Sequence, residues 1–280
     1  MKLVWAVLLS ALLSGCALTV SDPRALLPIE GFEPLAADPR VWHEPGYEAY
    51  AARVAAALPD AIAQVERAHF LRFAHRPRVF VCGTDACFKR WVRTPNLSAA
   101  VVPDNRLILS PRLDGRERWR LPALLTHELA HLHLGQRIGH YHSTLPIWFH
   151  EGWATLTAGG GGAEFATDRQ AIEAIRAGRR VNLSLRDTPD RRHRAADSNL
   201  SIFEFYRQSM LLVDWLKTRD KARFRALVLA VQDNADFGIA FAEIYGGTPA
   251  ARFAGFYDGV LSAPVAADDP SPILAAPARP

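Results

Sequence analysis

The chain has 280 residues, of which 49% are hydrophobic and 22% are charged, and its formal net charge is +4. This composition is typical of a globular protein and excludes a disordered or fibrous chain. The basic residues are scattered and form no block of five or more like charges, so the sequence favours a solvated, mildly basic surface and does not indicate nucleic-acid binding.

The N-terminus has the pattern of a secretory signal peptide. A positively charged start is followed by an almost wholly apolar run, residues 3–13, which is too short to span a bilayer comfortably. The next residues, 13–16 (LSGC), resemble the lipobox of bacterial lipoproteins, in which the peptide is cut before the cysteine and the cysteine is lipid-modified. We therefore predict a lipoprotein signal peptide over residues 1–15 and lipidation of Cys16. The alternative is an ordinary signal peptide with an incidental cysteine.

Lipidation implies a location on a membrane. Lipoproteins of this kind carry several acyl chains, which hold a protein firmly where one chain would hold it weakly. Ala17 follows the cysteine, and by resemblance to the sorting rule of enteric bacteria the absence of Asp there favours the outer membrane. The expected protein faces the periplasm on a lipid anchor at the outer membrane. Residues 16–45 are rich in Pro and Ala and are predicted to form a membrane-proximal linker.

Two further cysteines lie close together in the chain. Cys82 and Cys87 flank the short segment Gly-Thr-Asp-Ala. In an oxidising periplasm such a pair is expected to form a local disulfide. The alternative is half of a metal site, but no second Cys or His pair with zinc-finger spacing accompanies it.

The first part of the remaining chain mixes helical and β patterns. Residues 47–73 are Ala-rich with helical periodicity, which Pro59 should break or kink. Residues 78–82 form a β-rich run after a proline and predict a strand. Residues 99–102 and 107–109 predict two more strands, joined as a hairpin by a Pro-Asp-Asn turn.

Helices are predicted from there on. One should begin near Pro122, because proline suits the first helical turn, and should stop at Gly135. A second should begin near Pro146 and end before the glycine run 159–162. A third should be capped near Thr167, whose side chain can accept a hydrogen bond from the first turn.

The C-terminal part has a helical pattern. Residues 180–200 are polar and Arg-rich and predict a loop, and residues 202–261 are helical with breaks near Asn234 and at a Gly-Gly pair. Residues 263–280 are rich in Pro and Ala and are expected to be a mobile tail. This order predicts an α+β fold over residues 46–262: a small mixed α/β N-terminal lobe with a short sheet, then an all-helical C-terminal lobe.

The residues with the clearest chemistry are His127-Glu128-Leu129-Ala130-His131. Side chains at i and i+4 share one helix face, so both imidazoles can reach one metal ion at about 2.0–2.1 Å. The Glu between them can take a proton from a metal-bound water. The motif lies in an apolar run, where burying His and Glu without partners would be costly. Metal binding explains their presence, and the alternative is a pair of hydrogen-bonded core histidines.

A catalytic zinc site also needs a third protein ligand and an open position. The metzincin pattern is excluded, because Leu134 and Arg137 stand where it requires Gly and His. Glu151 follows His131 by twenty residues, which leaves room for a turn and a returning helix. Its segment, PIWFHEGWA, resembles the Trp-x-x-Glu-Gly-x-Ala signature of gluzincin zinc peptidases, including the aminopeptidase N type. The alternative for Glu151 is a carboxylate on a helix surface.

The resemblance to gluzincins extends over roughly residues 47–261 and implies a thermolysin-like fold with the metal helices at the junction of the two lobes. Residues 204–209 look like the Tyr-x-x-Ser helix of MA-like bacterial peptidases. That likeness implies that Tyr206 donates a hydrogen bond to the oxyanion, which is worth about 3–4 kcal/mol. The alternative is that Tyr206 is an ordinary core residue. Thr155 stands where several gluzincins have an acidic residue that orients the first His, so the partner of His127 is left open.

Together these residues predict a Zn²⁺-dependent peptidase that acts on peptides or proteins in the bacterial cell envelope. His127, His131 and Glu151 would hold the metal, and Glu128 would be the general base. The other nearby histidines, such as His150, are expected only to line the cleft. One rival hypothesis is a catalytically silent zinc-binding lipoprotein that acts in partner binding or assembly, although such a protein needs no base. Another is a hydrolase of cell-wall peptides.

Overall fold

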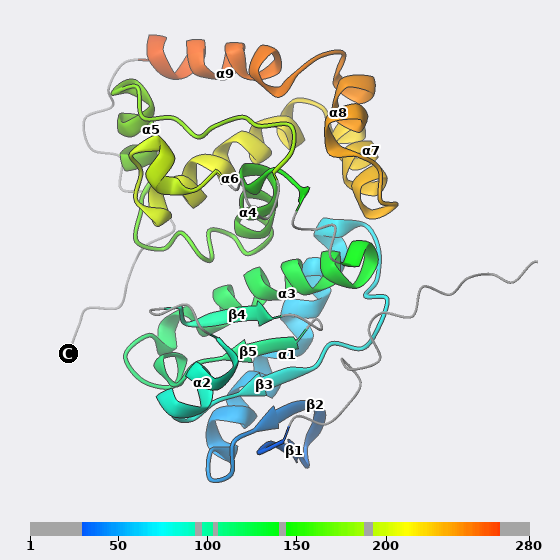
Figure 1. Cartoon of the computed structure of the whole chain (residues 1–280), viewed down its shortest axis with the longest axis vertical. Coiled ribbons are helices and arrows are strands. Elements are labelled where there is room, and N and C mark those ends of the chain that lie inside the picture. The colour runs from blue at the N-terminus through cyan, green and yellow to red at the C-terminus, as the bar shows by residue number, and fades with distance from the viewer. Residues whose placement is uncertain (1–29, 93–96, 103–105, 140–143, 188–192, 264–280) are drawn as a thin grey trace, which may run out of the picture.

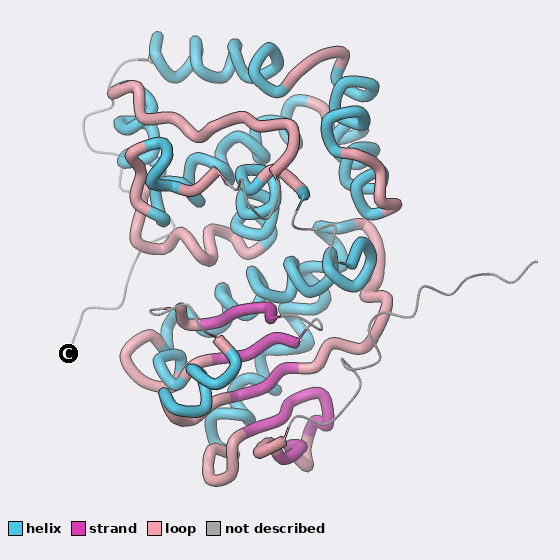
Figure 2. The backbone as a smooth tube through the Cα atoms, in the orientation of Figure 1, coloured by secondary structure: helices cyan, strands magenta, loops and turns pink. Residues whose placement is uncertain are grey.

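The computed structural model describes residues 30–92, 97–102, 106–139, 144–187 and 193–263. In Figure 1 the lower part of the molecule holds the sheet with α1, α2 and α3, and the upper part holds α4 to α9. Figure 2 shows that the strands are confined to the lower part. This is the α+β arrangement that the sequence predicts, with a small sheet near the N-terminus and a mostly helical remainder.

The described strands form one sheet with the order β1-β2-β3-β5-β4. Its central strands β2, β3 and β5 run parallel to one another, and the outer strands β1 and β4 are antiparallel to their neighbours. The strands are β1 (Glu33–Leu35), β2 (Asp38–His43), β3 (Val79–Val81), β4 (Ala99–Val102) and β5 (Arg106–Leu109). The predicted hairpin is β4 and β5, and its turn lies outside the described residues. The edge strand β4 is the one nearest α3 in Figure 1.

Side chains alternate between the two faces of the sheet, as the strand repeat requires. Val79 and Val81 pack on the face that is covered by α1 (Glu48–His69) and α3 (Leu121–Ile138). Phe80, between them, packs on the other face with Phe88 of α2 (Asp85–Trp91). The sheet therefore presents one apolar face to the helix that carries the HExxH motif.

The disulfide joins Cys82, directly after β3, to Cys87 in the first turn of α2. It is the pair for which the sequence favours a disulfide over a metal site. Helix α2 itself is not predicted by the sequence analysis. Its N-terminus is capped by the Thr84 hydroxyl, which accepts a hydrogen bond from the Cys87 backbone N–H.

The predicted linker is wrong in its second half, because residues 33–43 form β1 and β2. The prolines that suggested a linker lie at tolerated places. Pro34 is in an edge strand, and Pro39 precedes the stretch of β2 that pairs with β3. Residues 16–29 of that segment, the signal peptide and residues 264–280 of the predicted tail lie outside the described residues, and Cys16 with them.

Two helices continue past a residue at which the sequence predicts a break or an end. Helix α1 runs without a break through Pro59, although an interior proline costs about 3 kcal/mol. Val54, Leu58 and Val65 are completely buried on both sides of it, so packing outweighs the local cost. Helix α3 continues through Gly135 for one further turn.

The upper part is helical around a large aromatic core. Its helices are α4 (Ile147–Thr157), α5 (Asp168–Arg176), α6 (Ile202–Arg219), α7 (Lys221–Gln232), α8 (Phe237–Tyr245) and α9 (Pro249–Ser262). Completely buried rings fill the space between them, among them Trp148, Phe149, Phe205, Phe241 and Phe253. Among the helices of the described ranges, none combines the length and the hydrophobicity that crossing a membrane requires.

Most of the predicted helix ends in this part are confirmed. Helix α4 starts directly after Pro146, and Thr167 caps α5 through the backbone N–H of Gln170. The breaks near Asn234 and Gly246 separate α7, α8 and α9. A further break at Asp220, where an extended residue divides α6 from α7, is not visible in the hydrophobic pattern.

Candidate metal centre

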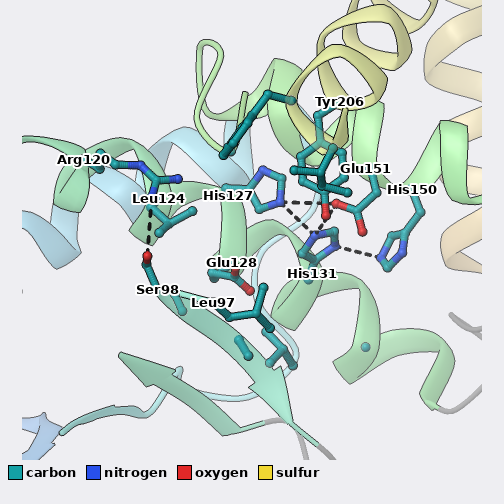
Figure 3. Close-up of a pocket in the computed structure, with 17 residues that line it drawn as sticks. Leu97, Ser98, Arg120, Leu124, His127, Glu128, His131, His150, Glu151 and Tyr206 are labelled. Atoms are coloured by element: carbon teal, nitrogen blue, oxygen red, sulfur yellow. Dashed lines mark hydrogen bonds and ion pairs between the residues drawn. The ribbon is translucent and has the colours of Figure 1, made fainter. Parts of the chain in front are cut away.

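Helices α3 and α4 bring the predicted ligands together at the junction of the two parts. His127 and His131 lie one turn apart on α3, and Glu151 lies on α4 (Figure 3). Helix α4 can pack closely against α6 because residue 152 is a glycine. A Cβ atom on Gly152 would lie only 2.4 Å from the backbone oxygen of Ser209. The small residue after Glu151 thus lets the helix approach its neighbour.

The three side chains present their ligand atoms to one point. The distance between His127 Nε2 and His131 Nε2 is 3.1 Å, and Glu151 Oε2 lies 3.4 Å from the former and 3.3 Å from the latter. Ligand atoms on a tetrahedral zinc with bonds of about 2.0–2.1 Å are about 3.3–3.4 Å apart. The three atoms are therefore spaced like three corners of a zinc tetrahedron, and the donor set fits Zn²⁺.

Burial supports the same interpretation. His127 and Glu151 are almost fully buried, and Glu151 Oε2 accepts no hydrogen bond of normal geometry from the described residues. Although the two imidazole nitrogens lie 3.3–3.4 Å away, a buried carboxylate oxygen that accepts no hydrogen bond is costly unless its charge is compensated. A cation at the point where the three atoms converge would do so.

Each histidine is oriented through its second ring nitrogen. His127 Nδ1 donates a hydrogen bond of 2.9 Å to the carbonyl oxygen of Gly161. His131 Nδ1 is 2.9 Å from His150 Nε2, and with Nδ1 as the donor its Nε2 lone pair faces the other ligands. Such partners fix the ring orientation and the tautomer of metal-binding histidines.

The sequence leaves the partner of His127 open between a hydroxyl and a backbone carbonyl, and it does not indicate a partner for His131. Thr155, at the position of the acidic residue in several gluzincins, is fully buried and its hydroxyl has no hydrogen-bond partner among the described residues. The carbonyl of Gly161 holds His127 in its place. His150, expected only to line the cleft, contacts His131 directly. The run of four glycines at 159–162 was the available signal, because so many glycines together indicate a close backbone approach.

The glycine run fits tightly against α3. Gly162 has a φ of +92°, and a Cβ atom there would lie 2.8 Å from both Nδ1 and Cε1 of His127. A Cβ atom on Gly161 would lie 2.5 Å from the backbone oxygen of Ala123. The loop can bring a carbonyl to the imidazole only because these two positions have no side chain.

The N-terminus of α4 is held from a distant part of the chain. Pro146 provides no side-chain cap, and the fully buried Asp187 accepts a hydrogen bond of 2.7 Å from the backbone N–H of Ile147. His193 Nδ1 lies 2.6 Å from the other carboxylate oxygen of Asp187. Because Glu151 is about one turn along α4, this anchor also positions the carboxylate ligand.

The charges of the site affect one another. Burial raises the pKa of Glu151, but the imidazoles of His131 and His127 outweigh it and hold that pKa well below its usual range. Burial also raises the pKa of Glu128, and there it exceeds the opposing effect of the two histidines. The two carboxylates therefore behave differently: one stays ionised toward the histidines, and the other holds a proton more readily.

The ligands, Glu128 and Tyr206 line one pocket of about 390 Å³. Residues of β4 form one wall, α3 forms another, and the start of α6 closes it opposite β4 (Figure 3). The Tyr206 ring stacks on His127 with centroids 5.8 Å apart. The structure thus gathers all predicted metal and catalytic residues around one space, while their roles in binding zinc and in catalysis stay predictions.

No family model matches the sequence, and no curated protein matches it. Among solved structures the chain is similar to native yeast LTA4 hydrolase, with a TM-score of 0.49 and 14% sequence identity. The match covers 86% of this chain and 40% of that one, so this chain spans less than half of its length.

Proposed function

We propose that this chain is a zinc-dependent hydrolase that cleaves peptide bonds in the bacterial cell envelope. The observation that carries the proposal is the spacing of His127 Nε2, His131 Nε2 and Glu151 Oε2 at 3.1–3.4 Å inside a pocket that Glu128 also lines. A structural zinc site is usually closed by four protein ligands, whereas a catalytic site has three and an open position. Three ligands beside a buried carboxylate fit the catalytic arrangement.

In the proposed reaction each residue has one role. Zinc bound by the three ligands would supply a water of pKa about 7 and polarise the substrate carbonyl. Glu128 accepts the proton of the attacking water and passes it to the leaving nitrogen. The raised pKa of its buried carboxyl suits a group that must hold and then release a proton.

Tyr206 is proposed to stabilise the oxyanion. Its ring stacks on His127, and the residue lines the same pocket as the ligands. A donor placed where negative charge develops contributes about 3–4 kcal/mol to the transition state. A catalytically silent zinc protein would need neither this hydroxyl nor the carboxylate of Glu128.

The location of the protein is proposed from the sequence alone. The LSGC segment supports cleavage before Cys16 and attachment to the outer membrane, facing the periplasm. Cys16→Ser should release the protein from the membrane fraction of an expressing bacterium. If the substituted and unsubstituted proteins fractionate alike, the lipid anchor is refuted.

The proposed activity is tested with Glu128→Gln. This variant should bind one equivalent of zinc, because the ligands are intact, and should cleave a peptide library or a denatured protein about 10²–10⁴ times more slowly. Glu173→Gln, at a largely exposed position on α5, is the matched control and should cleave normally. Undiminished turnover by Glu128→Gln would exclude the assignment.

A further inference from the structure

Exposed large hydrophobic residues gather around the mouth of the pocket. Seven such residues are exposed in the described part of the chain, and four of them, Leu97, Trp119, Phe165 and Ile202, lie on or beside the pocket. Leu97 and Ile202 line it directly. Single exposed apolar residues are ordinary, but a contiguous group of them beside a cleft indicates a binding surface.

Three aromatic rings connect this surface to the pocket. The ring centroids of Trp119 and Phe165 are 5.8 Å apart, and those of Phe165 and Phe203 are 4.9 Å apart. Phe203 also lines the pocket, whereas Trp119 and Phe165 are 47% and 54% exposed. We call these three residues the aromatic platform. They come from the segment before α3, the loop after the glycine run and the first turn of α6.

The positive charge of Arg120, next to the platform, is neutralised by neighbouring carboxylates. Arg120 is the one Lys or Arg among the described residues that line the pocket, and it is buried. Its guanidinium lies 2.5 Å from a Glu117 oxygen and 3.0 Å from a Glu164 oxygen, and it sits 5.1 Å from the Phe165 ring centroid. Because Arg120 is already paired with two carboxylates, it does not offer a binding site for the carboxylate of a substrate. The platform is therefore suited to apolar groups.

The size of the pocket indicates what reaches the platform. A volume of about 390 Å³ is near the lower end of the range for pockets that hold drug-sized ligands, so only a few substrate residues fit inside. A longer polypeptide must extend beyond the pocket, and Phe203, which lines the pocket, is in contact with the exposed Phe165 ring outside it.

We infer that the aromatic platform binds a large apolar side chain of a polypeptide substrate, a few residues from the bond that is cleaved. This inference rests on the proposed hydrolase function and specifies its substrate class. Side chains of Leu, Phe and Trp are mostly buried in folded proteins, so a surface that selects them in an extended chain selects unfolded or apolar segments. Aromatic rings contribute to such contacts both through their large buried area and through ring packing.

The inference is tested with matched peptides. Two series differ only in carrying Phe or Ser at each position in turn along one sequence. At one position of the series, Trp119→Ser and Phe165→Ser should each raise KM for the peptide that carries Phe about tenfold and leave kcat unchanged. A tenfold change is expected from losing part of an aromatic contact. The corresponding Ser peptide should be cleaved as by the unsubstituted protein. Ile239→Ser, at an exposed position of α8, is the control and should change neither series.

Three outcomes would overturn the inference. Equal losses for Phe and Ser peptides would show a general effect on the enzyme, and unchanged kinetics would show that the platform is not used. Sedimentation velocity tests a second copy of the chain as the occupant. A dimer of the unsubstituted protein that Trp119→Ser dissociates would overturn the inference as well.

Binding to the Glu128→Gln variant separates this inference from the proposed function. Fluorescence anisotropy of labelled peptides should show tighter binding of the Phe peptide, and Trp119→Ser in the same background should remove the difference. If that result is obtained while the unsubstituted protein cleaves no peptide, the hydrolase proposal fails and apolar recognition stands. If peptides are cleaved and Trp119 has no effect in either assay, the inference fails and the hydrolase proposal stands.

Discussion

Replacing Gly162 with Ala should weaken zinc binding through a small displacement of His127. The new Cβ atom would lie 2.8 Å from Nδ1 and Cε1 of the imidazole, whereas ordinary contacts begin at 3.4 Å. The ring or the loop must therefore move by about 0.6 Å, which exceeds the tolerance of about 0.2 Å in metal–ligand distances. Moving the loop would instead lengthen the hydrogen bond between His127 and the Gly161 carbonyl.

The expected magnitude follows from similar partners of metal-bound histidines. Their loss usually costs 10–100-fold in affinity, so the zinc Kd of Gly162→Ala should rise by about that factor, or about 1.4–2.8 kcal/mol. The assay is competition against a chelating indicator dye, with thermal unfolding of the metal-free protein as a check on folding.

Gly159→Ala is the control for this experiment. Gly159 belongs to the same glycine run and has a φ of +62°, but a Cβ atom there would meet nothing within 4 Å. Both variants should lose about 1–2 kcal/mol of stability from left-handed backbone strain, while only Gly162→Ala should lose zinc affinity. Equal zinc Kd values in two folded variants would refute the reasoning.

Three further predictions concern the same centre. His150→Ala should remove the partner of His131 Nδ1 and weaken zinc binding about 10–100-fold in the same competition assay. Asp187→Ala should leave the first N–H of α4 without its carboxylate and lower the free energy of unfolding, measured in urea, by about 1–3 kcal/mol. Removing the metal with a chelator should abolish hydrolysis and lower Tm, because an ion at 100 times its Kd stabilises the fold by about 2.7 kcal/mol.

Each of these has an outcome that would contradict it. A His150→Ala protein with unchanged zinc affinity would show that the contact with His131 is incidental. For Asp187→Ala, an unchanged urea midpoint would mean that another group caps α4. If chelation leaves both Tm and activity unchanged, neither property depends on a bound metal. If chelation lowers them, as expected, added zinc should restore both.

The histidine pair could be predicted because its geometry is local: His127 and His131 share a helix face at a spacing of four. Glu151 is indicated by the resemblance of its segment to the gluzincin signature, and the structure places it on the following helix α4. Strand β3 and the β4–β5 hairpin likewise follow from short β-rich runs, whereas the parallel pairing of β3 with β5 is known only from the structure. In each case a repeat of two or 3.6 residues is enough to indicate the element.

The parts that could not be predicted depend on the path of the chain in space. Gly161 meets His127 across 34 residues, and Asp187 meets Ile147 across 40, through loops that have no periodic pattern. At Pro59 the local pattern is misleading: proline disfavours a helix, but the buried residues before and after it in α1 stabilise the helix through packing. The aromatic platform could not be predicted from the sequence either, since its rings come from three separate segments.

The cores of the two parts interlock beside the metal helices. Leu134 and Ile138 of α3 pack in the helical core, while Ala154 of α4 packs in the core under the sheet. Because each helix packs in both cores, a displacement of one part relative to the other would change the distances between His127, His131 and Glu151. In the proposed hydrolase, the ligand geometry would therefore depend on the packing of both halves of the molecule.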